Sequence, residues 1–399
     1  MTQSSPPPYS SFMEGRRTFE KFSLFGGPLH RMGERLGFVR GGRSAIALGL
    51  ALGLLSWSIL CGLALIDGVG YKFFSLPVIA AHVRLLLVIP LLFLCESLLD
   101  TRLREFVSLI VRSGVVPTNA LPALETEITR TNRWRDSWFP EAMCLLATVL
   151  LTLFAAHLRL SGKTIGSDLG RAIDEFHLAG LWYWIICLPL VRFLGFRWLW
   201  RVALWWCFLW RVARSELHLV PTHPDGAAGL GYLEVVQTYF TPLVMAISAV
   251  MSASFAEEIS SGISVFEAIY PALATTLIMD LALVLLPPCF FTLKLRNCQE
   301  KGISGYSVLA AQYVNDFEKK WLNASSVQAE PLLGTPDLQS LADLSNSVAI
   351  VRNMRLIPVS ARLLMTVTVA ALLPMIPLFL FKYHIAELLQ RVIAKLAGL

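Results

Sequence analysis

Residues 44–66 read SAIALGLALGLLSWSILCGLALI, a stretch without a single charged side chain. An α-helix rises about 1.5 Å per residue, so about 20 apolar residues cross a hydrocarbon core about 30 Å thick. The run also begins too far into the chain, and is too long, to be the apolar region of a cleaved signal peptide. This stretch therefore predicts a transmembrane helix that stays attached to the chain.

Six further apolar runs follow. The 399 residues are 55% hydrophobic and 16% charged, whereas soluble domains carry about 25% charged residues. The additional runs cover residues 76–98, 140–157, 178–196, 236–256, 265–291 and 361–381. Together the runs predict an all-α, polytopic helical membrane protein with about seven transmembrane helices. The formal net charge of +6 does not indicate nucleic-acid binding, because the basic residues flank the apolar runs.

Residues 197–214, RWLWRVALWWCFLWRVAR, are ambiguous. The apolar core between Arg201 and Arg211 is about half the length of a crossing. A helix with arginines on one arc and tryptophans elsewhere is typical of a membrane interface. We therefore predict a Trp/Arg-rich interfacial helix at 197–214. The same residues could instead continue the 178–196 span at an angle, or cross the membrane as an eighth span.

The distribution of Lys and Arg favours seven spans. Without a crossing at 197–214, the N-terminal tail, the 99–139 loop, the interfacial helix and the 294–360 loop lie on one side and hold most of the basic residues. Basic residues concentrate on the cytoplasmic side, so the N-terminus is predicted to be cytoplasmic. The eight-span alternative stays open, because it would bring the basic C-terminal helix to that side as well.

The chain divides into four regions. Residues 1–43 predict a flexible cytoplasmic tail, since they begin with a Pro/Ser-rich stretch. Residues 44–293 predict the transmembrane bundle, including the interfacial helix. Residues 294–360 contain two helical patterns separated by NASSVQAEPLLG and predict a cytoplasmic helical hairpin. Residues 361–399 predict the last transmembrane helix and an amphipathic C-terminal helix.

Two features suggest protein partners in addition to the lipid bilayer. The small-residue run ALGLALG, residues 47–53, allows another helix to approach closely. With the interfacial helix, it makes a homo-oligomer an expectation. The hairpin at 294–360 offers a surface for a cytoplasmic protein partner.

Two ionisable residues fall at bilayer depth. Arg84 lies near the middle of the second apolar run, and Asp280 lies near the middle of the sixth. Each isolated charge there would cost about 2.5–3.5 kcal/mol, so each is expected to face the bundle interior and find a partner. We predict an Arg84–Asp280 pair. Such a pair could form part of an ion or proton pathway, or it could be a structural interhelical salt bridge.

Residues 217–234, LHLVPTHPDGAAGLGYLE, collect further polar residues. His218, His223 and Asp225 are of the right types to bind a metal ion, or to act as a general base with an orienting acid. Their spacing argues against a rigid site, because HxxxxH is not the i, i+4 pair that shares a helical face, and two prolines interrupt the segment. The metal interpretation is therefore the minor one, and no cofactor is expected.

A conformational elbow accounts for more of this segment. Asp225 and Gly226 supply turn chemistry, and Thr222 or Asp225 could cap the following helix. His223 would then hydrogen-bond to the backbone or to Asp225. The elbow would hold the Trp/Arg helix against the fifth span.

The motifs carry a resemblance. The stretch from FRWLWR through LVPTHPDGAAGLGYL, together with PLLGTPDLQSLADLSNSVAIVRNMR, resembles a family of uncharacterised bacterial multi-pass inner-membrane proteins with a PTHPDxxGGLG-like motif. Ala228 stands where that motif has glycine. The resemblance implies a bacterial inner (plasma) membrane and brings no activity with it.

Three functions remain. The first is a channel or transporter for ions or small polar solutes, based on Arg84, Asp280 and the prolines that interrupt several spans. The second is a membrane scaffold or regulatory subunit that binds partners through residues 294–360. The third, a membrane-embedded metal-dependent enzyme that uses His218, His223 and Asp225, is the least favoured, so the chain is not expected to be an enzyme.

Overall fold

The computed structural model describes residues 22–26, 42–160, 177–260, 269–322 and 336–379. Every regular element in these ranges is a helix. Six helices are long and apolar enough to cross a membrane, and a bent pair of helices within 270–321 makes a seventh when it is counted as one span. The chain is therefore an all-α, polytopic membrane protein, as its apolar runs predict.

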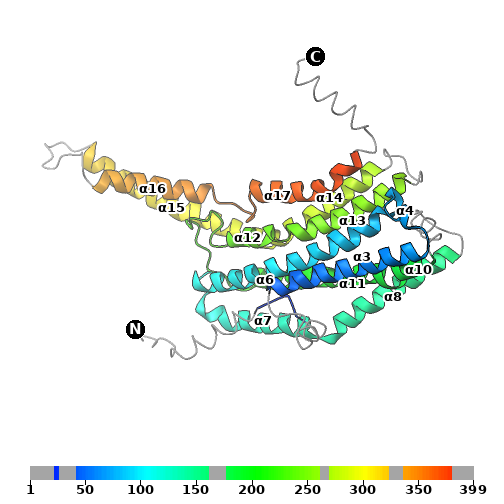
Figure 1. Ribbon diagram of the computed structural model, residues 1–399. Coiled ribbons are helices and arrows are strands. Elements are labelled where there is room, and N and C mark those ends of the chain that lie inside the picture. The colour runs from blue at the N-terminus through cyan, green and yellow to red at the C-terminus, as the bar shows by residue number, and fades with distance from the viewer. Residues whose placement is uncertain (1–21, 27–41, 161–176, 261–268, 323–335, 380–399) are drawn as a thin grey trace, which may run out of the picture.

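The first four spans follow the first four apolar runs. They are built from α3 (Gly42–Ile66); from η1 (Leu76–Val78), α5 (Ile79–His82), η2 (Val83–Val88) and α6 (Ile89–Arg112); from α8 (Trp138–Leu160); and from α10 (His177–Trp182), η4 (Tyr183–Cys187) and α11 (Leu188–Arg214). The short elements between them are α4 (Gly70–Phe73), η3 (Thr118–Ala120) and α7 (Leu121–Asp136). Figure 1 shows the span helices lying side by side.

The remaining spans complete the bundle. They are built from α12 (Tyr232–Thr238) with α13 (Thr241–Ser260), from the bent pair that begins with α14 (Tyr270–Leu285), and from α17 (Ala361–Leu372) with η7 (Leu373–Leu378). After α14 the chain bends by 44° into η6 (Pro287–Phe291) and α15 (Thr292–Trp321). The bend falls at Pro287 and Pro288, which cannot donate the backbone hydrogen bonds that would continue α14.

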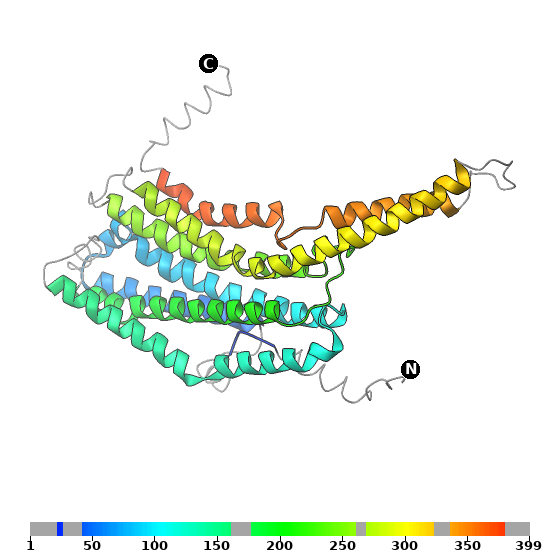
Figure 2. The ribbon, with the colours of Figure 1, turned by 180° about the vertical axis from the view of Figure 1, so that it is seen from behind.

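The segment 197–214 is not a separate interfacial helix. It is the second half of an unbroken helix that runs from residue 177 to residue 214, so it continues the fourth span. The helix packs against α6, α7 and α8, and Figure 2 shows α7 and α8 as a layer beside it. Arg201 and Trp205 are buried because neighbouring helices cover this segment on several sides. With no break before residue 197, the structure gives no eighth span here.

The small-residue run of α3 is used inside the chain. A Cβ atom at Gly53 would lie 2.3 Å from the carbonyl oxygen of Leu85, and one at Gly49 would lie 2.6 Å from Cβ of Phe93. These glycines let α3 pack closely on η2 and α6. The run therefore does not supply the free surface on which the expectation of a homo-oligomer partly rested.

Part of the N-terminal tail is docked, which corrects the prediction of a flexible tail throughout residues 1–43. Phe22, Leu24 and Phe25 are buried. The Phe22 ring centroid lies 4.5 Å from that of Phe208 in α11. The sequence FSLFG is an apolar island in a polar tail, and its burial follows from that composition. Residues 42 and 43 begin α3, and the rest of the tail lies outside the described residues.

The predicted hairpin is present as α15 and α16 (Pro336–Arg352), which pack against each other. Figures 1 and 2 show the pair extending beyond the bundle. Asp337 at the start of α16 accepts hydrogen bonds from Lys320 Nζ at 2.6 Å and from Trp321 Nε1 at 3.2 Å. These contacts join the far ends of the two helices. The predicted amphipathic helix at the C-terminus lies outside the described residues.

Candidate functional site

Arg84 is tied to hydroxyl groups and not to Asp280. Its Nη1 donates to Tyr183 Oη at 2.6 Å, and its Nη2 donates to Ser254 Oγ at 2.9 Å. Among the described residues no salt bridge joins Arg84 to Asp280, so the predicted pair is wrong. The sequence reveals that a charge lies at bilayer depth, but it does not reveal which hydroxyl groups surround that charge in the folded chain.

Arg84 and Tyr183 both lie in π-helical turns. Arg84 belongs to η2 and Tyr183 to η4, and each turn ends two residues before a proline, Pro90 or Pro189. A proline removes one helical hydrogen bond, and its ring clashes with the carbonyl four residues earlier. A widened π turn relieves that clash, and such turns are frequent at functional sites. Pro90 and Pro189 are thus the sequence signal for the two π turns.

Asp280 is a second buried ionisable group, on the other side of α13. Its side chain has no exposed surface. Oδ2 accepts a hydrogen bond from Ser248 Oγ at 2.7 Å, whereas Oδ1 has no hydrogen-bond partner in the described ranges. A carboxyl oxygen without a partner is costly in an apolar environment. Asp280 is therefore an energetically costly group at this place in the bundle.

Helix α13 connects the two groups. Ser248 and Ser254 are six residues apart, which places them about 9 Å apart along the helix and about 120° apart around it. One serine holds Asp280 of α14, and the other holds Arg84 of η2. Helix α13 also packs against α6, α17 and η7. It is the central helix to which both ionisable groups are attached.

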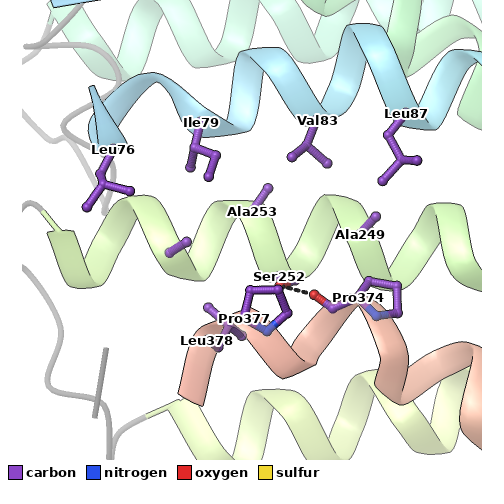
Figure 3. Close-up of a pocket in the computed structure, with 11 residues that line it drawn as sticks. Leu76, Ile79, Val83, Leu87, Ala249, Ser252, Ala253, Pro374, Pro377 and Leu378 are labelled. Carbon is purple, nitrogen blue, oxygen red and sulfur yellow. Dashed lines mark hydrogen bonds between the residues drawn. The ribbon is translucent and has the colours of Figure 1, made fainter. Parts of the chain in front are cut away.

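A groove of about 490 Å³ runs along α13 beside these groups. Figure 3 shows its walls, formed by residues from the second span, α13 and η7. Apart from the Ser252 hydroxyl its lining is apolar, and neither Arg84 nor Asp280 lines it. Ser252 Oγ donates to the carbonyl of Pro374 at 2.7 Å. In a 3₁₀ turn this carbonyl would take its hydrogen bond from residue 377, which is a proline without an N–H.

The PTHPDG segment forms the predicted elbow, and Asp225 is its centre. Oδ1 accepts from the amides of Ala227 at 2.8 Å and Gly229 at 3.1 Å, and Oδ2 accepts from Gly231 at 2.7 Å. His223 Nδ1 lies 2.9 Å from Oδ1. Burial alone would raise the pKa of Asp225, but these hydrogen bonds hold it below its usual range. The carboxylate organises the loop.

The elbow backbone includes left-handed positions. Gly226, Ala228 and Gly229 have φ angles of 64°, 55° and 98°. A Cβ atom at Gly229 would lie 2.5 Å from Val115 Cγ2, so this position requires glycine for space as well as for conformation. Ala228, which replaces a glycine of the resembling motif, adopts the left-handed conformation and is fully buried.

Arg355 fastens the elbow to the chain between the hairpin and the last span. Its Nη1 donates to Glu234 at 2.7 Å, its Nη2 to the Asp225 carbonyl at 2.9 Å, and its backbone N–H to the Gly226 carbonyl at 2.8 Å. Ser360, which caps α17 through the Leu363 amide, also donates to Glu234. The elbow therefore connects to the last span as well as to the fifth.

Thr222 does not cap the following helix, whereas Asp225 accepts a hydrogen bond from the amide of Gly231, the N-cap residue of α12. Gly231 itself has no side chain with which to cap α12. Thr222 Oγ1 instead accepts from Tyr306 Oη of α15 at 3.5 Å, which is a long contact. The elbow thus also touches the base of the hairpin.

The structure gives the metal hypothesis no third ligand. The described ranges contain no group of three His, Cys, Asp or Glu side chains able to hold a metal ion. His223 contacts Asp225, and both oxygens of Asp225 already accept backbone hydrogen bonds. His218 lies on the wall of a separate groove with Glu216.

Comparison of the chain with protein-family models, with curated proteins and with solved structures finds no match. The candidate functional groups gather at two places, around α13 and at the Asp225 elbow.

Proposed function

We propose that this protein is a channel or transporter for ions or small polar solutes, with protons as the first ion to test. The observation that carries the proposal is Asp280, which is fully buried within a span and has one carboxyl oxygen without a partner among the described residues. Buried carboxyl groups at such depth commonly mark proton and ion pathways.

The surroundings of Asp280 support this proposal. Ser248 offers a hydroxyl that can either donate or accept a hydrogen bond, so Asp280 can be held in both its charged and its protonated form. On another face of α13, Arg84 supplies a fixed positive charge in one π turn and contacts Tyr183 of a second π turn. Such turns leave backbone groups that can exchange partners when the helices move.

The test is proton flux into liposomes that contain the purified protein, under an imposed pH gradient. We expect Asp280→Asn to abolish flux, because the amide cannot bind and release a proton. Asp343→Asn is the matched control, since Asp343 lies on the exposed hairpin helix α16. Equal flux in wild type and Asp280→Asn, with both proteins monodisperse, would remove the proposal.

A second candidate function is that of a scaffold or regulatory subunit. It is favoured by the apolar side chains that the projecting hairpin exposes, among them Val308, Leu309 and Leu338. Replacing residues 303–334 and the exposed part of α16, up to residue 350, with a short Gly/Ser linker should release a partner that co-purifies with the full chain. Identical sets of co-purifying proteins would argue against this role.

We also propose a bacterial inner membrane and a cytoplasmic N-terminus. The distribution of Lys and Arg and the resemblance of the PTHPD segment support this placement. Reporter fusions at the N-terminus and after residue 399 test it: seven spans require the two ends on opposite sides, and signals on the same side would contradict that count.

A further inference from the structure

A groove of about 740 Å³ with both polar and apolar lining lies where three segments leave the bundle. Its walls come from the turn after α6, from the extended chain that follows Arg214, and from the first three turns of α15 after the bend. The first two segments follow the ends of helices long enough to cross a membrane, and the third follows the bend after α14. The groove therefore lies at one end of the bundle, beyond the apolar runs that end at residues 98, 196 and 291.

One face of α15 supplies most of the polar lining. Lys294, Asn297, Cys298 and Lys301 line the groove, and their spacing of three, four and seven residues places them on one helical face. His218 and Glu216 lie on the opposite wall. Two lysines against one carboxylate leave the groove with an excess of positive charge.

The carboxylate and one lysine are already engaged. Asn119 Nδ2 donates to Glu216 Oε2 at 3.0 Å, and Lys294 Nζ donates to the carbonyl of Ser215. In contrast, the side chains of Lys301, Asn297 and His218 form no hydrogen bond within the described chain. The groups left available in the groove are thus mainly hydrogen-bond donors, as an anion requires.

We propose that this groove binds the phosphate group of an anionic ligand. Lys301 is the principal contact, and His218 and Asn297 donate from the two walls. Leu217, Leu219 and Pro221 add apolar lining beside these donors, which suits the glycerol part of a phospholipid headgroup. The same phosphate chemistry could be presented by a lipid or by a soluble phosphate ester, and the experiment separates these sources. The inference does not depend on the transport proposal.

The lipid arm measures lipid adducts by native mass spectrometry after exposure of the full chain to phosphatidylcholine or phosphatidic acid. We expect wild type to bind phosphatidic acid in preference to phosphatidylcholine. In Lys301→Gln the ratio of the two adducts should fall about fivefold, in line with the contribution of one lysine near an anionic surface. Lys319→Gln, on the same helix but exposed and far along the hairpin, is the matched control and should behave as wild type.

The soluble arm follows the ³¹P signal of glycerol 3-phosphate with the same protein in neutral detergent. Broadening of the signal by wild type but not by Lys301→Gln would show that the phosphate group is recognised without lipid chains. Lipid preference without broadening would show that the ligand is a membrane lipid.

His218→Gln serves as a second variant, since the residue is exposed and its replacement leaves packing unchanged. In each assay in which wild type binds the phosphate ligand, His218→Gln should bind it more weakly. Equal adducts with both lipids and no ³¹P broadening would overturn the proposal, as would the same loss in Lys319→Gln as in Lys301→Gln.

Discussion

Arg84 and Tyr183 join two π-helical turns that belong to different spans, through a hydrogen bond of 2.6 Å between the guanidinium and the phenol oxygen. Each turn lies just before a proline. A π turn therefore lies on each side of this contact. The widened backbone brings the Arg84 guanidinium within hydrogen-bonding reach of the Tyr183 hydroxyl inside the bundle.

Tyr183→Phe should destabilise the protein. The substitution keeps the buried ring but removes the acceptor of a charged donor, a loss of about 1.5–3 kcal/mol in the free energy of unfolding. Unfolding in mixed micelles measures the change. Tyr71→Phe is the control, because Tyr71 is 77% exposed; a Tyr183→Phe protein as stable as this control would show that the contact contributes nothing.

The buried pair of Glu96 and Arg201 should behave as a unit. Two hydrogen bonds of 2.9 and 3.1 Å join the side chains, and the guanidinium lies 4.6 Å from the Phe25 ring centroid. Arg201→Leu alone should cost about 3–5 kcal/mol, because it removes the charged group that compensates a buried carboxylate. The double variant Glu96→Leu/Arg201→Leu should cost less than the single one. Additive losses in the same unfolding assay would contradict the pair.

Asp225 should make stability depend on pH in the acidic range. Its folded pKa lies below the unfolded value of about 3.9. Its contribution is thus fully present above the unfolded pKa and is lost as the pH falls through the folded pKa. Thermal unfolding between about pH 6 and pH 3 should show a shallower decline for Asp225→Asn, from a lower starting stability. Asp343→Asn should keep the wild-type slope, and an unchanged slope in Asp225→Asn would exclude this role.

Gly302 and Gly305 form a matched pair in α15. A Cβ atom at Gly302 would lie 2.8 Å from Pro221 and 2.9 Å from Val351, whereas one at Gly305 meets nothing within 4 Å. Gly302→Ala should therefore loosen the base of the hairpin, and Gly305→Ala should stabilise the helix by about 0.4–1 kcal/mol. Limited proteolysis within α16 reports both effects. Faster cleavage in Gly305→Ala than in Gly302→Ala would reverse the expectation.

The apolar runs predict the spans because hydrophobicity and length are local properties of the chain. They do not predict that residues 197–214 are buried, since the partner of Arg201 is Glu96, 105 residues earlier. The pairing of Arg84 fails for a related reason: periodicity identifies the charge, but Tyr183 and Ser254 become neighbours only after packing.

The elbow is more visible in the sequence because its main hydrogen bonds are local. Asp225 reaches amides two, four and six residues further along the chain, so turn chemistry identifies the loop. Arg355 is 121 residues from Glu234, and no local pattern connects them. The sequence therefore indicates the residues that organise the elbow turn and the ionisable residues at bilayer depth. It does not indicate the distant residues with which they form hydrogen bonds.

The docked segment at Phe22–Gly26 imposes an order on biosynthesis. These residues leave the ribosome first, but the surface that receives Phe22 includes Trp205 and Phe208, which are made nearly two hundred residues later. The segment must wait, undocked, until the fourth span has been inserted. An interruption of synthesis before residue 208 therefore leaves the tail without its binding surface.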